Sequence, residues 1–241
     1  MCVIYLAFGR RPDLPLIVAA NRDEFYDRPT AAAARWDDEP GIVAGRDLVS
    51  GGTWLGVADG GRFAAVTNYR DPNPPLGIRS RGMLVADFLR GRSSVHEYIR
   101  DIASHASEFS GFNLLLGEIN SDRREVNYFS NRENIARELS PDFYGLSNHL
   151  LDTPWPKVSR GKERFKAIVE KGFASNEPMF ELLTDPNVAE DEELPDTGVG
   201  REKEKILSPI FIKTPIYGTR CSTVVTIDAK GNASLDERTF V

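Results

Sequence analysis

The sequence has few of the side chains that build disulfide frameworks and metal centres. Its 241 residues include only two cysteines, Cys2 and Cys221, and three histidines. No CxxC pair occurs, and His96, His105 and His149 are widely separated, so we predict no metal site. So low a cysteine count is typical of a reducing compartment, although the sequence alone leaves a bond between the two cysteines open.

Positive charge and long apolar runs are also scarce. Acidic residues outnumber basic ones by 36 to 30, giving a formal net charge of −6, which argues against a nucleic-acid partner. No stretch approaches the roughly 18 apolar residues that a transmembrane helix needs. The apolar run at residues 3–8 is too short for a secretory signal and its arginines follow it, so we expect a cytoplasmic location.

What the sequence does contain is the hydrophobic content of a single globular domain, which we place at residues 1–241. Hydrophobic residues make up 41% and charged residues 27% of the chain. Compact apolar runs bounded by turn residues predict strands at 3–8, 14–20, 54–58, 62–68, 112–117, 125–129, 144–148, 210–213, 219–228 and 234–240.

Helices are predicted between these groups of strands, at 80–89, from Ser94 onward, at 157–172 and at 178–184. Ser94 and Glu97 have the spacing of a capping box. Grouped strands that alternate with grouped helices predict an α+β fold. A four-layer αββα sandwich, with two antiparallel sheets between helices, fits this order.

Cys2 is the first candidate for chemistry. Met1 precedes a small side chain, the situation in which an initiator methionine is usually removed, so we expect Cys2 to become N-terminal. Its α-amine, with a reference pKa of about 7.7–8.0, could then act as general base for its own thiol. Nearby arginine charge would lower the thiol pKa. The alternative is a small apolar residue that opens a buried strand.

Polar residues follow two of the predicted strands. Arg22 could orient a carboxylate or lower a thiol pKa, and Asp23 could accept hydrogen bonds from an α-ammonium; the alternative is a salt-bridge cluster. The amide of Asn68 could donate to an oxyanion, whereas the alternative is an Asx turn. Asn148, in a loop, and Arg220, at the start of a strand, are ordinary when each is taken alone.

Residues 185–205 carry many carboxylates and few large apolar side chains, which predicts a surface loop. A loop of this length can also act as a lid over a site. We expect it at the mouth of the cavity that holds Cys2.

Several short motifs, taken together and in order, resemble one known family. They are Met1-Cys2, Asn21-Arg22-Asp23-Glu24, Gly52-Thr53-Trp54-Leu55-Gly56, Thr67-Asn68-Tyr69-Arg70, Gly145-Leu146-Ser147-Asn148, Leu194-Pro195-Asp196-Thr197-Gly198 and Tyr217-Gly218-Thr219-Arg220. The set spans nearly the whole chain and resembles the NRDE family, also called the transport and Golgi organisation 2 family. That family looks related to the Ntn hydrolases, whose fold the resemblance implies here.

Among the Ntn hydrolases, the resemblance points to the cholylglycine hydrolase and penicillin V acylase branch, which cleaves non-peptide amides with an N-terminal cysteine. By motif, Cys2 resembles the nucleophile and Arg220 the arginine that steadies it. Asn68 and Asn148 resemble the asparagines of the oxyanion region and the substrate side. Further candidate binding residues in these motifs are Asn21, Glu24, Trp54 and Tyr69.

Arg22 and Asp23 resemble the arginine and aspartate at the end of the second strand in that branch. There the two are usually three residues apart, whereas here they are adjacent. Neighbours on a strand point to opposite faces, so Asp23 could share a face with Asn21, and Arg22 would lie opposite.

The resemblance implies two functions. The first is a cysteine amidohydrolase or thioesterase that acts on an acylated small molecule and requires no cofactor. The second is a non-catalytic carrier, because the family is implicated in haem trafficking, secretory-pathway organisation and lipid metabolism. Haem is therefore a possible bound ligand, although neither Cys2, His149 nor any tyrosine has a diagnostic spacing for an axial ligand. The oligomeric state is left open.

Overall fold

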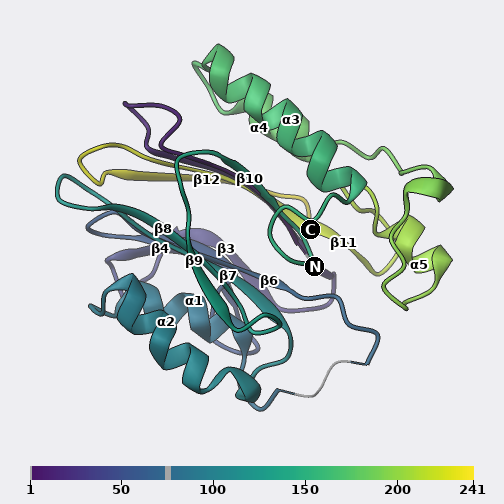
Figure 1. Ribbon diagram of the computed structural model, residues 1–241, viewed down its shortest axis with the longest axis horizontal. Helices are drawn as coiled ribbons and strands as arrows, with labels where there is room; N and C mark the ends of the chain where they lie inside the picture. Colours follow the sequence, from purple (N-terminus) through teal and green to yellow (C-terminus); the bar gives the residue numbers. More distant parts are fainter. Residues whose placement is uncertain (1, 74–76) are drawn as a thin grey trace.

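The fold is a sandwich of two antiparallel β-sheets with helices outside each sheet (Figure 1). The computed structural model describes residues 2–73 and 77–241. The layers run helix, sheet, sheet, helix, which confirms the predicted α+β sandwich.

The two sheets differ in the order of their strands along the sequence. One has five strands in the order β10-β1-β2-β11-β12 and so combines both ends of the chain. Its strands are β1 (Cys2–Phe8), β2 (Leu16–Phe25), β10 (Phe143–Leu146), β11 (Tyr217–Ile227) and β12 (Ala233–Thr239). The other has seven strands in chain order. They are β3 (Thr30–Arg35), β4 (Ile42–Asp47), β5 (Leu55–Ala58), β6 (Arg62–Asn68), β7 (Phe112–Ile119), β8 (Arg124–Ser130) and β9 (Ile135–Glu138).

Each sheet has its own pair of helices (Figure 1). Helices α1 (Arg81–Arg90) and α2 (Val95–Ser104) cover the seven-stranded sheet, and α3 (Pro156–Lys171) and α4 (Glu177–Leu183) cover the five-stranded sheet. A short helix, α5 (Arg201–Ile206), lies in the connection from α4 to β11. Within the described residues, no helix is both long and apolar enough to cross a membrane.

The inner strands are apolar on both faces because they lie between two layers. In β1, Ile4 and Leu6 pack against residues of the seven-stranded sheet. Val3 and Tyr5 pack on the other face, against α3 and α4. A third apolar cluster joins the seven-stranded sheet to α1 and α2. A strand buried on both faces has a continuous apolar run, and this run made β1 visible in the sequence.

Two local predictions are confirmed. The hairpin of β5 and β6 turns through Gly60 and Gly61, whose φ angles of +80° and +75° suit glycine. At the start of α2, Ser94 and Glu97 form both hydrogen bonds of a capping box.

Three strands of the seven-stranded sheet were absent from the sequence prediction. β3 and β9 are its edge strands and are largely exposed, so neither shows an apolar pattern. β4 is only half apolar. Conversely, the strand predicted at 210–213 is wrong: a single bridge from Lys213 to Gly218 is formed there. Ile210 and Ile212 are buried by packing rather than by a sheet ladder.

Residues 185–205 are more ordered than a plain loop. They contain a 3₁₀ turn at Asp191–Glu193 and most of α5. Leu194 is buried and so is Glu204, although most other carboxylates of the segment are exposed, as predicted. Glu204 is the exception because it forms an ion pair with the buried Arg70.

Candidate active site

The register of the five-stranded sheet places Cys2 beside Arg22. Cys2 lies opposite Arg22 of β2, and Arg22 lies opposite Cys221 of β11. Directly opposed residues share a face and faces alternate along a strand, so all three lie on the face of Ile4, between the sheets. The strand β2 therefore separates the two cysteines, and both are free.

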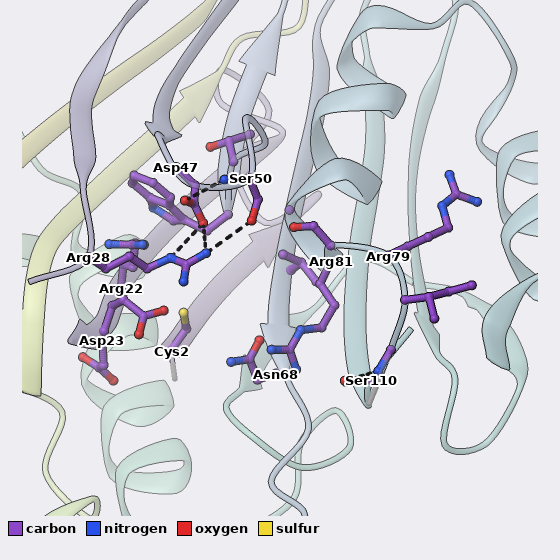
Figure 2. Close-up of a pocket in the computed structure, with 18 residues that line it drawn as sticks. Cys2, Arg22, Asp23, Arg28, Asp47, Ser50, Asn68, Arg79, Arg81 and Ser110 are labelled. Atoms are coloured by element: carbon purple, nitrogen blue, oxygen red, sulfur yellow. Dashed lines mark hydrogen bonds and ion pairs between the residues drawn. The ribbon is translucent and has the colours of Figure 1, made fainter. Parts of the chain in front are cut away.

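Cys2 lines a cavity of about 390 Å³ where strand ends of both sheets meet the start of α1 (Figure 2). The walls come from β1, β2 and β6, from the connection between β4 and β5, and from the first residues of α1. Seven of the lining residues are charged: Arg22, Asp23, Glu24, Arg28, Asp47, Arg79 and Arg81.

The sequence prediction ended the second strand at residue 20, before the polar residues, but β2 continues to Phe25. Arg22 and Asp23 therefore belong to the sheet and alternate in direction, as their adjacency suggested. Arg22 faces the space between the sheets, whereas Asp23 shares the opposite face with Asn21 and borders the cavity only where β2 nears its end.

Arg22 is buried on top of Trp54. Its guanidinium carbon lies 4.2 Å from the centroid of the Trp54 ring. Trp54 fits there because Gly45 has no side chain: a Cβ at Gly45 would come 2.2 Å from Trp54 Cη2. The buried Nη1 of Arg22 has no hydrogen-bond partner in the described part of the chain. Arg22 is also absent from the ion pairs found there.

Asp23 is held by groups on the other side of the sheet. Its Oδ1 accepts a hydrogen bond of 2.7 Å from Thr219 Oγ1. Burial raises the pKa of the Asp23 carboxyl, while the Lys157 ammonium and the Thr219 hydroxyl act in the opposite direction. Lys157, from α3, is itself buried and donates to Leu207 O at 2.9 Å. Burial lowers the pKa of Lys157 to about 8, so this positive charge is held at a cost.

The thiol of Cys2 is not strongly acidified. Burial raises its pKa, and the Asp23 carboxylate adds to the rise. The Arg22 charge lowers the pKa, as predicted, but burial outweighs it. A thiol in this state is mostly protonated at neutral pH and needs a base to become a nucleophile.

Asn68 and Asn148 form one hydrogen-bonded unit. Asn68, the last residue of β6, lines the cavity with Cys2 (Figure 2). The buried Asn148 donates from Nδ2 to Asn68 O at 2.9 Å, and the neighbouring Ser147 donates from Oγ to Cys2 O at 3.0 Å. The loop at 147–148 thus ties the start of β1 to the end of β6. Asn148 is not among the lining residues of the cavity in the described chain. It contributes indirectly, by holding the backbone of Asn68.

Arg220 does not reach the thiol but binds backbone. It lies at a bulge of β11, and its Nη1 donates to the carbonyl oxygens of Phe25, Tyr26 and Arg28 at 2.8, 3.1 and 3.0 Å. Arg220 therefore fixes the chain that leaves β2. Its effect on Cys2 is indirect, and the role implied by the resemblance stays a prediction.

The candidate binding residues divide into two groups. Glu24 and Trp54 line the cavity. Asn21 instead points toward the outer helices and donates from Nδ2 to the carbonyl oxygens of Leu183 and Ile210 at 2.7 and 2.9 Å. Tyr69 packs against His149, with ring centroids 4.9 Å apart, outside the described lining.

Sequence reasoning missed several residues of the cavity. Arg28 donates from Nη2 to Asp47 Oδ2 at 2.7 Å and closes one wall (Figure 2). Arg81, the first residue of α1, reaches another wall, and the serine N-cap Ser80 lines it as well. For Arg81, the sequence did contain one indication of a binding role: an arginine follows a serine N-cap, and the start of a helix can bind anions.

The acidic segment 185–205 contributes no lining residue in the described chain. The expectation that it stands at the mouth of the cavity therefore has no support from the lining. Its Asp185 pairs with Arg164 of α3 instead.

Four layers, with a cysteine at the head of the first strand, define an Ntn-hydrolase-like fold. A solved N-acylethanolamine-hydrolyzing acid amidase ortholog from Caenorhabditis elegans has the same fold, with a TM-score of 0.52 and 12% identity. The alignment covers 92% of this chain and 92% of that chain.

The chain belongs to the Transport and Golgi organisation 2 family, whose model matches residues 1–241. The Transport and Golgi organization protein 2 homolog of Bos taurus is 36% identical, over 100% of this chain and 94% of the relative. The homolog of Homo sapiens is 35% identical with the same coverage. The predicted family is confirmed.

Proposed function

We propose that this protein is an N-terminal-cysteine hydrolase that cleaves an amide or thioester bond of an acylated small molecule. The observation that carries the proposal is the position of Cys2, at the head of β1 and in the wall of a cavity shared with Arg22 and Asn68. The Ntn-hydrolase-like fold supports it, and so does the amide-cleaving activity named for the structural neighbour.

In the proposed reaction, removal of Met1 frees the α-amine of Cys2. The amine takes the thiol proton, and the sulfur attacks the substrate carbonyl carbon. Asn68 donates to the oxyanion that forms, while Asn148 fixes Asn68 through its backbone oxygen. The C–N or C–S bond then breaks, and the leaving group takes the proton from the α-ammonium. Water, activated by the amine, hydrolyses the thioester on Cys2 and releases the acid.

Because the pKa of the Cys2 thiol is raised, we assign the α-amine the role of general base. Because burial keeps the Cys2 thiol protonated, a base within reach is required, and an amine with a reference pKa of about 7.7–8.0 is suited to neutral pH. Asp23 lies on the neighbouring strand and could hold the α-ammonium between proton transfers.

The lining of this cavity argues against haem as its ligand. Seven charged side chains line it, whereas a macrocycle requires broad apolar walls. His149 is engaged elsewhere, with Nδ1 at 2.8 Å from Thr153 Oγ1 and its ring in contact with the rings of Tyr69 and Trp155. We therefore derive no step through haem.

The test is turnover of a panel of fluorogenic acyl amides and acyl thioesters by mature protein, with intact mass used to establish that Met1 is absent. Cys2→Ala should reduce turnover by several orders of magnitude, because no acyl-enzyme can form. The matched control is Cys221→Ala, which removes the buried thiol on the other side of β2 and should leave turnover within a fewfold of wild type.

Trapped acyl-enzyme on Cys2, seen as an added acyl mass, would support the mechanism. Retention of Met1 in the mature protein would remove the base. An inactive wild type that binds acyl ligands equally well after Cys2→Ala would instead indicate a carrier.

A further inference from the structure

We propose that the substrate of the Cys2 cavity carries a free carboxylate, which binds to Arg81 at the start of α1. The inference rests on the proposed function and adds a substrate class to it. Three features of the cavity wall support it.

The first feature is Arg81 itself. It is partly buried, lines the cavity and makes one hydrogen bond, from Nη1 to Gly111 O at 3.1 Å. Figure 2 shows its side chain running from the start of α1 toward Asn68. In the described chain no carboxylate lies within ion-pair distance of Arg81. Most of its donors are thus available to a ligand.

The second feature is the helix that Arg81 begins. Helix α1 has ten residues, and its N-cap Ser80 makes no side-chain capping hydrogen bond. Ser80 and Gly82 both line the cavity. The first N–H groups of a helix lack partners within the helix and carry a partial positive charge, which favours an anion at this end.

The third feature is Arg22, whose buried Nη1 has no hydrogen-bond partner in the described chain. Because Nη1 itself has almost no accessible surface, a ligand would be attracted by the positive charge of Arg22, which has no hydrogen-bonded counter-ion among the described residues. Arg22 and Arg81 line the same cavity together with Cys2. A planar anion within the cavity can therefore accept hydrogen bonds from a guanidinium while its acyl carbon is presented to sulfur.

The charge balance of the wall favours a single negative charge. Arg28 is already neutralised by Asp47. Glu24 also lines the cavity and would repel a ligand with two charges. A carboxylate adds one charge and has the planar shape that matches a guanidinium fork, whereas a phosphate monoester adds nearly two.

The experiment measures binding to the Cys2→Ala variant by calorimetry, so that catalysis does not enter the readout. The probes are two pairs that differ in one group: N-butyrylglycine against N-butyrylglycinamide, and glutaric acid monoanilide against pentananilide. At least one carboxylate probe should bind about tenfold more tightly than its neutral partner, the effect of roughly one charged hydrogen bond.

Arg81→Gln in that background should abolish the preference, and Arg81→Lys should restore part of it. The matched control is Arg90→Gln at the other end of α1, since Arg90 pairs with Glu39 and Asp87 and is not among the described lining residues of the cavity. Thermal melts would establish that each variant is folded. The proposal is overturned if neither pair shows a preference, if Arg90→Gln removes it equally, or if inorganic phosphate displaces the carboxylate probe at lower concentration than acetate does. Failure of the proposed hydrolase function would be distinguished from failure of this proposal, because it would appear only as absent turnover in wild type.

Discussion

Arg22 and Arg70 are both buried, and each lies against a tryptophan, but only one has a counter-ion. The guanidinium carbon of Arg22 is 4.2 Å from the ring centroid of Trp54, and that of Arg70 is 4.6 Å from the centroid of Trp155. Arg70 pairs with the buried Glu204, whereas Arg22 has no ion pair among the described residues.

Unpartnered nitrogens alone do not separate the two arginines, because Nε and Nη2 of Arg70 also lack partners within the described chain. The difference is charge. Glu204 neutralises Arg70, which ties α5 to the chain just after β6, and it also accepts a hydrogen bond of 3.0 Å from the backbone N–H of Thr197. The charge of Arg22 is left facing a cavity. A compensated buried charge fixes the fold, and an uncompensated one in a cavity is typical of a binding site.

The largest expected effect comes from breaking the compensated pair. Glu204→Gln keeps the shape of the side chain but leaves Arg70 as an unpaired buried charge, which should lower the free energy of unfolding by about 3–5 kcal/mol. Urea denaturation measures this change. The double variant Glu204→Gln with Arg70→Met should recover much of the loss. A loss in the single variant below about 1 kcal/mol would show that the pair is not what stabilises this region.

The second prediction concerns Lys157, whose pKa is affected by charges from both regions. Asp23, Cys2 and Glu204 raise its pKa and Arg70 lowers it, but burial dominates and brings the pKa to about 8 from 10.5. Above pH 8 the unfolded chain retains this proton while the folded chain loses it, so stability should rise between pH 8 and 10.5. The rise is at most roughly 3 kcal/mol, and below pH 8 the full penalty of the buried charge is present.

Lys157→Met removes this titration while keeping the volume of the side chain. The pH dependence of the unfolding free energy of the variant, subtracted from that of wild type, isolates the lysine from the buried tyrosines that titrate nearby. A difference that stays flat from pH 8 to 10.5 would mean that Lys157 is normally charged in the fold. Asp23 would then face a stronger positive charge than the pKa of about 8 implies.

The sequence predicted the parts of the fold that are determined locally. Strands buried on both faces, such as β1, have continuous apolar runs, and the Ser94 capping box is complete within four residues. Edge strands β3 and β9 are exposed and are held only by one neighbour, so their residues carry no such pattern. Their pairing depends on tertiary context that a short window of sequence does not contain.

Site residues that belong to a recognisable motif could be predicted from the sequence. Contacts between residues that are distant in the sequence could not. Cys2, Arg22 and Asn68 meet in one cavity as the resemblance implied. Arg220 instead binds carbonyl oxygens about two hundred residues earlier in the chain, at a bulge that shifts the register of β11. Arg81 was missed because an arginine in the first turn of a helix usually faces solvent. Its role depends on where the sheets place the start of α1.

The smallest expected effect on stability comes from Arg22→Met, and this variant tests the comparison of the two arginines directly. Methionine fills much of the space over Trp54, and no carboxylate is left without a partner. Replacing a buried charge with an apolar group of similar volume is often close to neutral, so the free energy of unfolding should change by no more than about 1 kcal/mol. Arg70→Met, the matched substitution at the other tryptophan, leaves Glu204 buried without its ion-pair partner and should cost about 3–5 kcal/mol.

The reactivity of Cys2 should show the opposite pattern, with an effect in Arg22→Met and none in Arg70→Met. Arg22 lowers the pKa of the Cys2 thiol, so the alkylation of Cys2 by iodoacetamide should shift to higher pH in Arg22→Met and stay unchanged in Arg70→Met. Equal losses of stability in the two variants, together with an unchanged alkylation profile for Arg22→Met, would place Arg22 in the scaffold and remove the distinction between the two regions.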